Sequence, residues 1–131
     1  MAARVSACIV DTHPLVWWLL EPDRLSRLAM ETLGDPAVSV HVPAMAVLEF
    51  QYLVEIGRIV ANTGDVLAYI GENERFRLMP YDATVLAASL DMKDTRDPFD
   101  RVIASSALAY GMPLVTKDKW MHERLGRQAY W

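Results

Sequence analysis

Short, continuous apolar runs alternate along the chain with stretches that have helical spacing. The continuous runs predict strands at residues 5–10, 38–42, 78–79 and 113–116. Residues 128–131 could add an edge strand or equally form a loose tail. Apolar residues at helical spacing predict helices at residues 15–20, 25–33, 44–56, 66–70, 85–90 and 102–110. Strands that are apolar on both faces are typical of a parallel sheet covered by helices. We therefore predict a three-layer α/β fold with a central parallel sheet of four to five strands.

Length and composition suit one globular domain. The chain has 131 residues, 53% of them hydrophobic and 23% charged, a balance that supports one continuous core but not two. We expect residues 1–131 to form a single domain. The first apolar run ends in Asp11 rather than at a small-residue cleavage site, so we interpret it as a strand and not as a signal peptide. With one cysteine and no long apolar segment, we expect a cytoplasmic protein that does not enter a membrane.

The charge balance limits how the protein can contact nucleic acid. With 13 Lys plus Arg against 17 Asp plus Glu, the net charge is −4, which argues against binding by bulk electrostatic attraction. Contact with nucleic acid must then be local or metal-assisted. The basic residues expected to steer such a substrate are Arg75, Arg77, Lys93, Arg96, Arg101, Lys117 and Lys119.

Four acidic residues occupy positions at which this fold usually binds ligands. Asp11 and Asp118 follow apolar strand segments, and ligands of open parallel sheets bind beyond the carboxyl ends of the strands. Asp100 lies in the first turn of a predicted helix, and Glu49 interrupts an apolar helix that would otherwise bury it without a partner. We therefore expect the four carboxylates to converge on one site.

Converging carboxylates repel one another, and a hard divalent cation relieves that repulsion. Mg²⁺ or Mn²⁺ suits an all-carboxylate set. Zinc is disfavoured because the cysteine and the histidines form no CxxC or HExxH arrangement.

Each acid also has a structural interpretation. Asp97, which precedes a proline, is expected to cap a helix, and Asp118 alone could do the same for the next one. Asp100 alone could pair with a neighbouring arginine, Arg96 or Arg101. His13 follows Asp11 closely enough to reach a substrate phosphate, although a histidine at this position is more often simply solvated.

The order of four segments resembles the PIN domain, and most closely the VapC-type toxins of toxin–antitoxin pairs. The segments are residues 9–12 (IVDT), 46–49 (AVLE), 97–104 (DPFDRVIA) and 114–118 (LVTKD). The resemblance spans nearly the whole chain. It implies a central parallel sheet, a carboxylate cluster that binds Mg²⁺ or Mn²⁺, and endonucleolytic cleavage of RNA. The acids that it places in the catalytic and metal-binding set are Asp11, Glu49, Asp100 and Asp118.

The resemblance also suggests supporting residues and partners. Thr12 and Thr116 are expected to hold a metal-bound water or a phosphate oxygen, and Asp97 is an additional carboxylate near Asp100. The expected partners are RNA, a cognate antitoxin and a second copy of the chain. The strongly apolar segment 12–20 is predicted to form the homodimer face or the antitoxin groove. Trp17, Trp18 and Trp120 could stack on bases, but we favour a place in the core or at an interface.

Two other functions compete with a toxin endoribonuclease that uses water as its nucleophile and leaves 5′-phosphate and 3′-hydroxyl ends. The first is a catalytically silent PIN-like scaffold that acts through protein contacts; four converging acids speak against it. The second is a phosphatase or phosphoryl receiver with Asp11 as nucleophile. His13 occupies the position of the second acid in the DxD phosphatase motif, which disfavours that alternative.

Overall fold

A five-stranded parallel sheet forms the centre of the molecule in the computed structural model, which describes residues 5–131. The strands are β1 (Ala7–Val10), β2 (Ser39–Pro43), β3 (Phe76–Met79), β4 (Leu114–Val115) and β5 (Ala129–Tyr130), in the order β3-β2-β1-β4-β5. All four pairings are parallel. The predicted parallel sheet, including the last edge strand, is confirmed. Residues 1–4, which belong to the predicted domain, lie outside the described residues.

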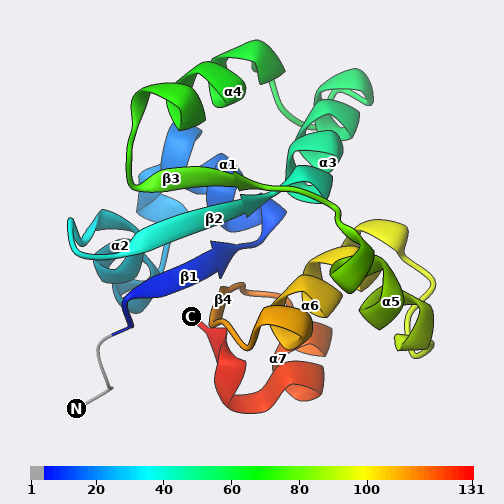
Figure 1. The fold of residues 1–131 in the computed structure, drawn as a ribbon. Helices are drawn as coiled ribbons and strands as arrows, with labels where there is room; N and C mark the ends of the chain where they lie inside the picture. The colour runs from blue at the N-terminus through cyan, green and yellow to red at the C-terminus, as the bar shows by residue number, and fades with distance from the viewer. Residues whose placement is uncertain (1–4) are drawn as a thin grey trace.

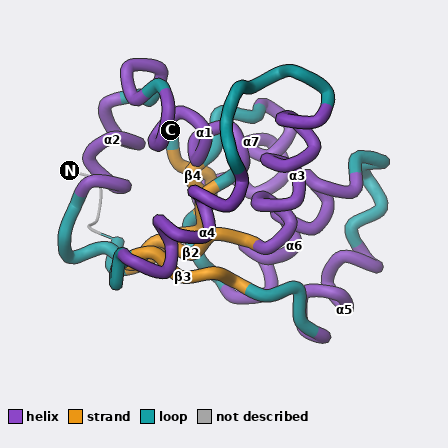
Figure 2. Tube along the Cα trace, turned by 90° about the horizontal axis from the view of Figure 1, so that it is seen from above, coloured by secondary structure: helices purple, strands orange, loops and turns teal. Residues whose placement is uncertain are grey.

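Helices cover both faces of the sheet, as the layered pattern predicts. They are α1 (Thr12–Leu20), α2 (Arg27–Gly34), α3 (Ala44–Glu55), α4 (Thr63–Glu72), α5 (Ala83–Asp91), α6 (Pro98–Tyr110) and α7 (Lys119–Leu125), with 3₁₀ turns η1 (Pro22–Arg24) and η2 (Gly126–Gln128). The arrows of β1, β2 and β3 run in one direction and end near α3 and α6 (Figure 1). Seen from above, α5 lies at the outer end of the molecule beyond α6 (Figure 2). None of the helices in the described part of the chain has the length and apolarity that a bilayer crossing requires.

Capping explains two of the differences between the predicted and the observed helices. Helix α1 begins at Thr12 rather than at residue 15, since the Asp11 carboxylate accepts a hydrogen bond from the Thr12 N–H and caps the first turn. Helix α7, absent from the predicted helices, begins after Asp118, which accepts from the Met121 N–H. Both caps place an acid at a strand-to-helix junction.

The sheet separates two hydrophobic clusters. On β1, Cys8 and Val10 face a cluster formed with α1 to α4, while Ile9 faces a second cluster formed with α6 and α7. All three side chains are almost completely buried. Burial of alternate residues on opposite faces explains why the run is continuously apolar rather than alternating.

The prediction that segment 12–20 forms a partner-binding face is wrong. Leu15, Val16 and Trp17 are only 1%, 4% and 7% exposed, because η1, α2 and α3 pack around α1. The core position favoured for the tryptophans is confirmed for Trp17, and Trp18 and Trp120 pack partly buried against the two clusters. Within segment 12–20, Leu20 is the one large apolar residue that is exposed, at 44%. Most exposed apolar side chains of the described residues lie on other elements, among them Leu48, Tyr52 and Ile56 of or next to α3.

Arg75 was expected to steer substrate, but it stabilises the fold. Its guanidinium donates to the carbonyl oxygens of Leu33 (2.9 Å), Asp35 (2.7 Å) and Val38 (3.0 Å). These carbonyls belong to the end of α2 and to the turn that leads into β2. The last carbonyls of a helix have no N–H donor within the helix, so Arg75 supplies one. Arg101 is likewise used inside the fold, where it donates to Ser89 and Leu90 carbonyls of α5.

Replacement of Arg75 by methionine is expected to lower the free energy of unfolding by about 2–3 kcal/mol, because three partly buried carbonyls lose a charged donor. Urea denaturation measures the change. Arg77→Met is the matched control: this exposed arginine lies on β3, two residues after Arg75, and the expected change is within about 0.5 kcal/mol. Equal stabilities of the two variants would contradict the capping role.

Candidate metal centre

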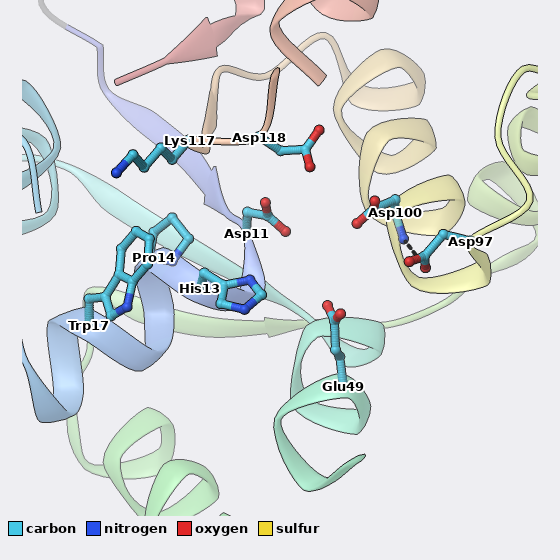
Figure 3. Close-up of a pocket in the computed structure, with 9 residues that line it drawn as sticks. All are labelled: Asp11, His13, Pro14, Trp17, Glu49, Asp97, Asp100, Lys117 and Asp118. Atoms are coloured by element: carbon cyan, nitrogen blue, oxygen red, sulfur yellow. Dashed lines mark hydrogen bonds between the residues drawn. The ribbon is translucent and has the colours of Figure 1, made fainter. Parts of the chain in front are cut away.

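The predicted acids meet in a cleft at the carboxyl ends of the strands. Asp11 joins β1 to α1, Glu49 lies in α3, Asp100 in the first turn of α6, and Asp118 between β4 and α7. The cleft has a volume of about 390 Å³ and is lined by Asp11, His13, Pro14, Trp17, Glu49, Asp97, Asp100, Lys117 and Asp118. Figure 3 shows the carboxylates of the acids turned towards a common space. Segments distant in the sequence thus supply one acidic site.

Three of the carboxylates form a compact group. One oxygen from each of Asp11, Glu49 and Asp100 lies within 4.8 Å of the others. Asp118 lines the same cleft outside this group, and its Oδ1 caps α7 by accepting from the Met121 N–H at 2.9 Å. Asp118 can therefore both cap α7 and contribute to the site, because the cap uses only one of its two carboxylate oxygens.

Two buried threonines hold the carboxylates in place. Thr116 donates its hydroxyl to Asp11 Oδ2 (2.8 Å) and accepts from the Asp118 N–H (3.0 Å). The Thr12 hydroxyl donates to Glu49 Oε1, and the Thr12 N–H donates to Asp11 Oδ1 at 2.8 Å. We expected these hydroxyls to hold a water or a phosphate oxygen. In the structure both are fully buried and bonded to carboxylates instead.

Asp97 and Asp100 have different roles at the start of α6. Asp97 Oδ1 accepts from the Phe99 N–H (2.9 Å) and the Asp100 N–H (3.1 Å), which confirms the helix cap. Among residues 5–131, no cation forms an ion pair with Asp100, and Arg101 is bonded to α5. The structural alternative of an Asp100–arginine pair is thus excluded for the described residues, and the carboxylate is left facing the other acids.

Burial and mutual repulsion make this group hard to ionise without a cation. Burial raises the pKa of Asp11 to about 6, against the opposing hydrogen bonds from Thr116 and Thr12. Burial raises the pKa of Asp100 to about 7, with further contributions from the charges of Asp11, Asp97, Asp118 and Glu49. The pKa of Glu49 is also raised, chiefly by burial. A bound cation would favour the charged form of all three.

The donor set fits a hard divalent cation. In the part of the chain that the structure describes, the group contains only carboxylate oxygens and no imidazole or thiolate. Cys8 is buried in the core, where desolvation raises its pKa to about 12. Oxygen ligands of this kind are those that Mg²⁺ and Mn²⁺ prefer.

Thr116→Val should destabilise the protein by about 1–3 kcal/mol, because Asp11 Oδ2 and the Asp118 N–H lose a partner inside the protein. Thermal denaturation in chelator measures this loss. Ser105→Ala provides the contrast: this hydroxyl is fully buried but has no hydrogen-bond partner among residues 5–131. Its removal is expected to be neutral or stabilising. A harmless Thr116→Val would show that the hydroxyl does not position Asp11.

The sequence did not indicate which basic residue reaches the site. Of the seven predicted to steer substrate, Lys117 alone lines the cleft. Trp17 also lines it, although its side chain is largely buried. The sequence signal that could have identified Lys117 is its position beside Asp118, shortly after β4. This position places Lys117 at the same edge of the sheet as the acids.

The sheet and the cleft together define a parallel α/β protein with a carboxylate site suited to a divalent cation. Comparison with known proteins identifies its family. The model of the PIN domain matches residues 8–126. The chain is 30% identical over 118 residues to Ribonuclease VapC22 of Mycobacterium tuberculosis, covering 88% of this chain and 89% of that protein. The chain belongs to the PIN-domain family and is a VapC-type member of it.

Solved structures with the same fold come from several bacteria. VapBC2 from Rickettsia felis, bound to a DNA fragment from its promoter, matches with a TM-score of 0.65 at 16% identity, covering 92% of this chain and 93% of that chain. A toxin–antitoxin complex from Klebsiella pneumoniae matches with a TM-score of 0.66 at 11% identity, covering 95% and 96%. At these identities the similarity shows the PIN-like α/β fold.

Proposed function

We propose that the protein is a metal-dependent endoribonuclease, the toxin component of a type II toxin–antitoxin system, with residues 1–131 as one nuclease domain. The observation that carries the proposal is the group of Asp11, Glu49 and Asp100, whose oxygens lie within 4.8 Å of one another. Its membership of a family that includes a ribonuclease 30% identical to this chain supports RNA as the substrate. We assign Asp11, Glu49, Asp100 and Asp118 to the catalytic and metal-binding set, and Mg²⁺ or Mn²⁺ as the cofactor.

The position of each side chain indicates its role, either in binding the cation or in orienting the carboxylates. Asp11 and Asp100 would bind the cation, with Glu49 of α3 and Asp118, the residue that caps α7, completing the set. When bound, the cation lowers the pKa of a water and offsets negative charge at the phosphate. Thr12 and Thr116 keep the carboxylates oriented through their hydrogen bonds. Among residues 5–131 the lining of the cleft offers no Ser–His or Cys–His pair for a covalent route, which supports water as the nucleophile.

We also propose an antitoxin as protein partner and a homodimer as the assembly. The structures from Rickettsia felis and Klebsiella pneumoniae hold a toxin together with its antitoxin, which supports the first of these. The exposed apolar side chains of α3, more than α1 with Leu20 alone, are available for such contacts. The acidic group argues against a catalytically silent scaffold, because protein contacts do not require carboxylates with raised pKa values.

Incubation of the purified protein with mixed-sequence RNA tests the proposed function. Cleavage is expected with Mg²⁺ or Mn²⁺, and none with EDTA or with the Asp11→Asn variant. Product ends should carry 5′-phosphate, which ligation to an adaptor detects. Cleavage that persists in EDTA and in Asp11→Asn would refute the assignment of this site.

A further inference from the structure

The cleft has two chemically different ends. The carboxylates of Asp11, Glu49, Asp97, Asp100 and Asp118 occupy one end, and Pro14, Trp17 and Lys117 line the other, with His13 between them (Figure 3). In Figure 3 the Lys117 side chain runs away from Asp118, and its ammonium group points to the side of Trp17 and Pro14. Lys117 is the only lysine or arginine among the lining residues. Its charge is therefore directed towards the neighbouring space rather than towards the acids.

The Trp17 indole forms a rigid support for this end. The ring is 7% exposed and packs against the Trp131 ring at 5.7 Å. The Lys117 Nζ lies 5.9 Å from the ring centroid, and the guanidinium carbon of Arg24 lies 4.7 Å from it. Cations at these distances are attracted by an aromatic face. Trp17 is too buried to stack on a base, but it holds two cations beside the cleft, of which Arg24 also pairs with Glu21 at 3.2 Å.

We propose that Lys117, with Arg24 beyond it, binds the backbone phosphate next to the scissile one, so that single-stranded RNA leaves the acidic centre across the Trp17 edge. This inference rests on the proposed function. A cleft of about 390 Å³ is the size of a small-molecule site, which suits a short single-stranded segment. The exposed His13 ring, 5.9 Å from Trp17, lies between the two ends and is available for stacking on a base.

Electrostatics require a cation at this point. The protein has a net charge of −4, and the cleft itself carries five carboxylates. A divalent ion offsets that charge where the scissile phosphate binds, but not at the next phosphate along the strand, which would otherwise be repelled. Lys117 supplies this positive charge at the end of the cleft opposite the acids. Because the Trp17 indole restricts the Lys117 side chain before RNA binds, that side chain loses less conformational entropy on binding.

RNA binding on an uncleaving background tests this subsite. In the Asp100→Asn background, with constant Mg²⁺, Lys117→Ala should raise the Kd of a fluorescent single-stranded RNA about tenfold. The slope of log Kd against log salt concentration should fall by about 0.7, the value for one lost phosphate contact. Lys117→Arg should restore most of the affinity, and Arg24→Ala should weaken binding in the same direction. Lys119→Ala, which removes an exposed lysine outside the cleft, is the matched control and should bind normally.

The same variants in the cleaving protein separate binding from chemistry. Lys117→Ala should raise KM about tenfold and leave kcat nearly unchanged. If Lys117 only offsets the acids, Lys117→Ala will instead tighten Mn²⁺ binding and leave the RNA Kd unchanged, which overturns the inference. Wild-type cleavage of RNA combined with unchanged binding by Lys117→Ala refutes this subsite alone. A wild-type protein that neither binds nor cleaves RNA refutes the proposed function as well.

Discussion

Replacement of Asp100 by asparagine is expected to abolish RNA cleavage while raising the thermal stability of the metal-free protein at pH 8. Loss of a ligand removes several kcal/mol of charge stabilisation in the transition state, which corresponds to a decrease in kcat/KM of about 10³-fold. The same carboxylate is partly buried and faces four other acids; burial first, and then the charges of these acids, raise its pKa to about 7. At pH 8 its charge therefore destabilises the folded, metal-free chain. An amide of the same shape removes that repulsion.

Comparison of two pH values separates this effect from a general change in packing. At pH 5 Asp100 is protonated in the folded protein, because that pH lies below its pKa of about 7. The stability gain of Asp100→Asn should then largely disappear. Asp91→Asn, an exposed acid at the end of α5 outside the cleft, should cleave normally and show no such dependence on pH. An active Asp100→Asn, or one that is less stable than wild type at pH 8 in EDTA, would contradict the assignment.

Mn²⁺ is expected to raise the Tm of the wild-type protein by on the order of 10 °C at pH 8 when present at about 100 times its Kd. At pH 5 the rise should be small. Burial and neighbouring acids raise the pKa of Asp11 from 3.8 to about 6 and that of Asp100 from 3.8 to about 7. These groups stabilise the metal-free fold below about pH 4, and this contribution is lost as the pH rises through 6 and 7. The cation competes with protons for the carboxylates of Asp11 and Asp100. It therefore stabilises the protein most at a pH at which these carboxylates are ionised.

Two measurements test this linkage. Differential scanning fluorimetry from pH 5 to pH 8, with EDTA or Mn²⁺, should show the two stability curves diverging as the pH rises. Calorimetric titration near pH 6.5 in buffers of different ionisation enthalpy should show proton release on metal binding. In Asp11→Asn both the divergence and most of the proton release should be reduced. A Tm rise of equal size at pH 5 and pH 8 would mean that the ion binds elsewhere.

The strands and the acidic positions were accessible from local patterns. Continuous burial of Cys8, Ile9 and Val10 produces an apolar run that only a strand covered on both faces requires. Acids that directly follow such runs must lie at the carboxyl edge of a parallel sheet. The sequence therefore indicated Asp11 and Asp118 correctly as neighbours of one edge. Glu49 was indicated because an acid in an apolar helix needs a partner.

The predictions for segment 12–20 and for Arg75 were wrong because the same residue types occur both in the core and at binding surfaces. Segment 12–20 is apolar whether a partner or the protein's own helices cover it, and only the packing of η1, α2 and α3 identifies it as core. Arg75 has the same chemistry whether it binds phosphate or caps a helix. The carbonyls that it caps come from residues 33 to 38, and no local pattern reveals that proximity.

The sequence by itself determined the parallel α/β architecture and the residues able to ligate a hard cation, because periodicity and side-chain chemistry are local properties. Tertiary structure decided which groups act together. It brought three carboxylates within 4.8 Å, turned the hydroxyls of Thr12 and Thr116 onto them, and directed Lys117 to the opposite end of the cleft. These relations depend on distances between segments up to 105 positions apart, and such distances exist only once the sheet has formed.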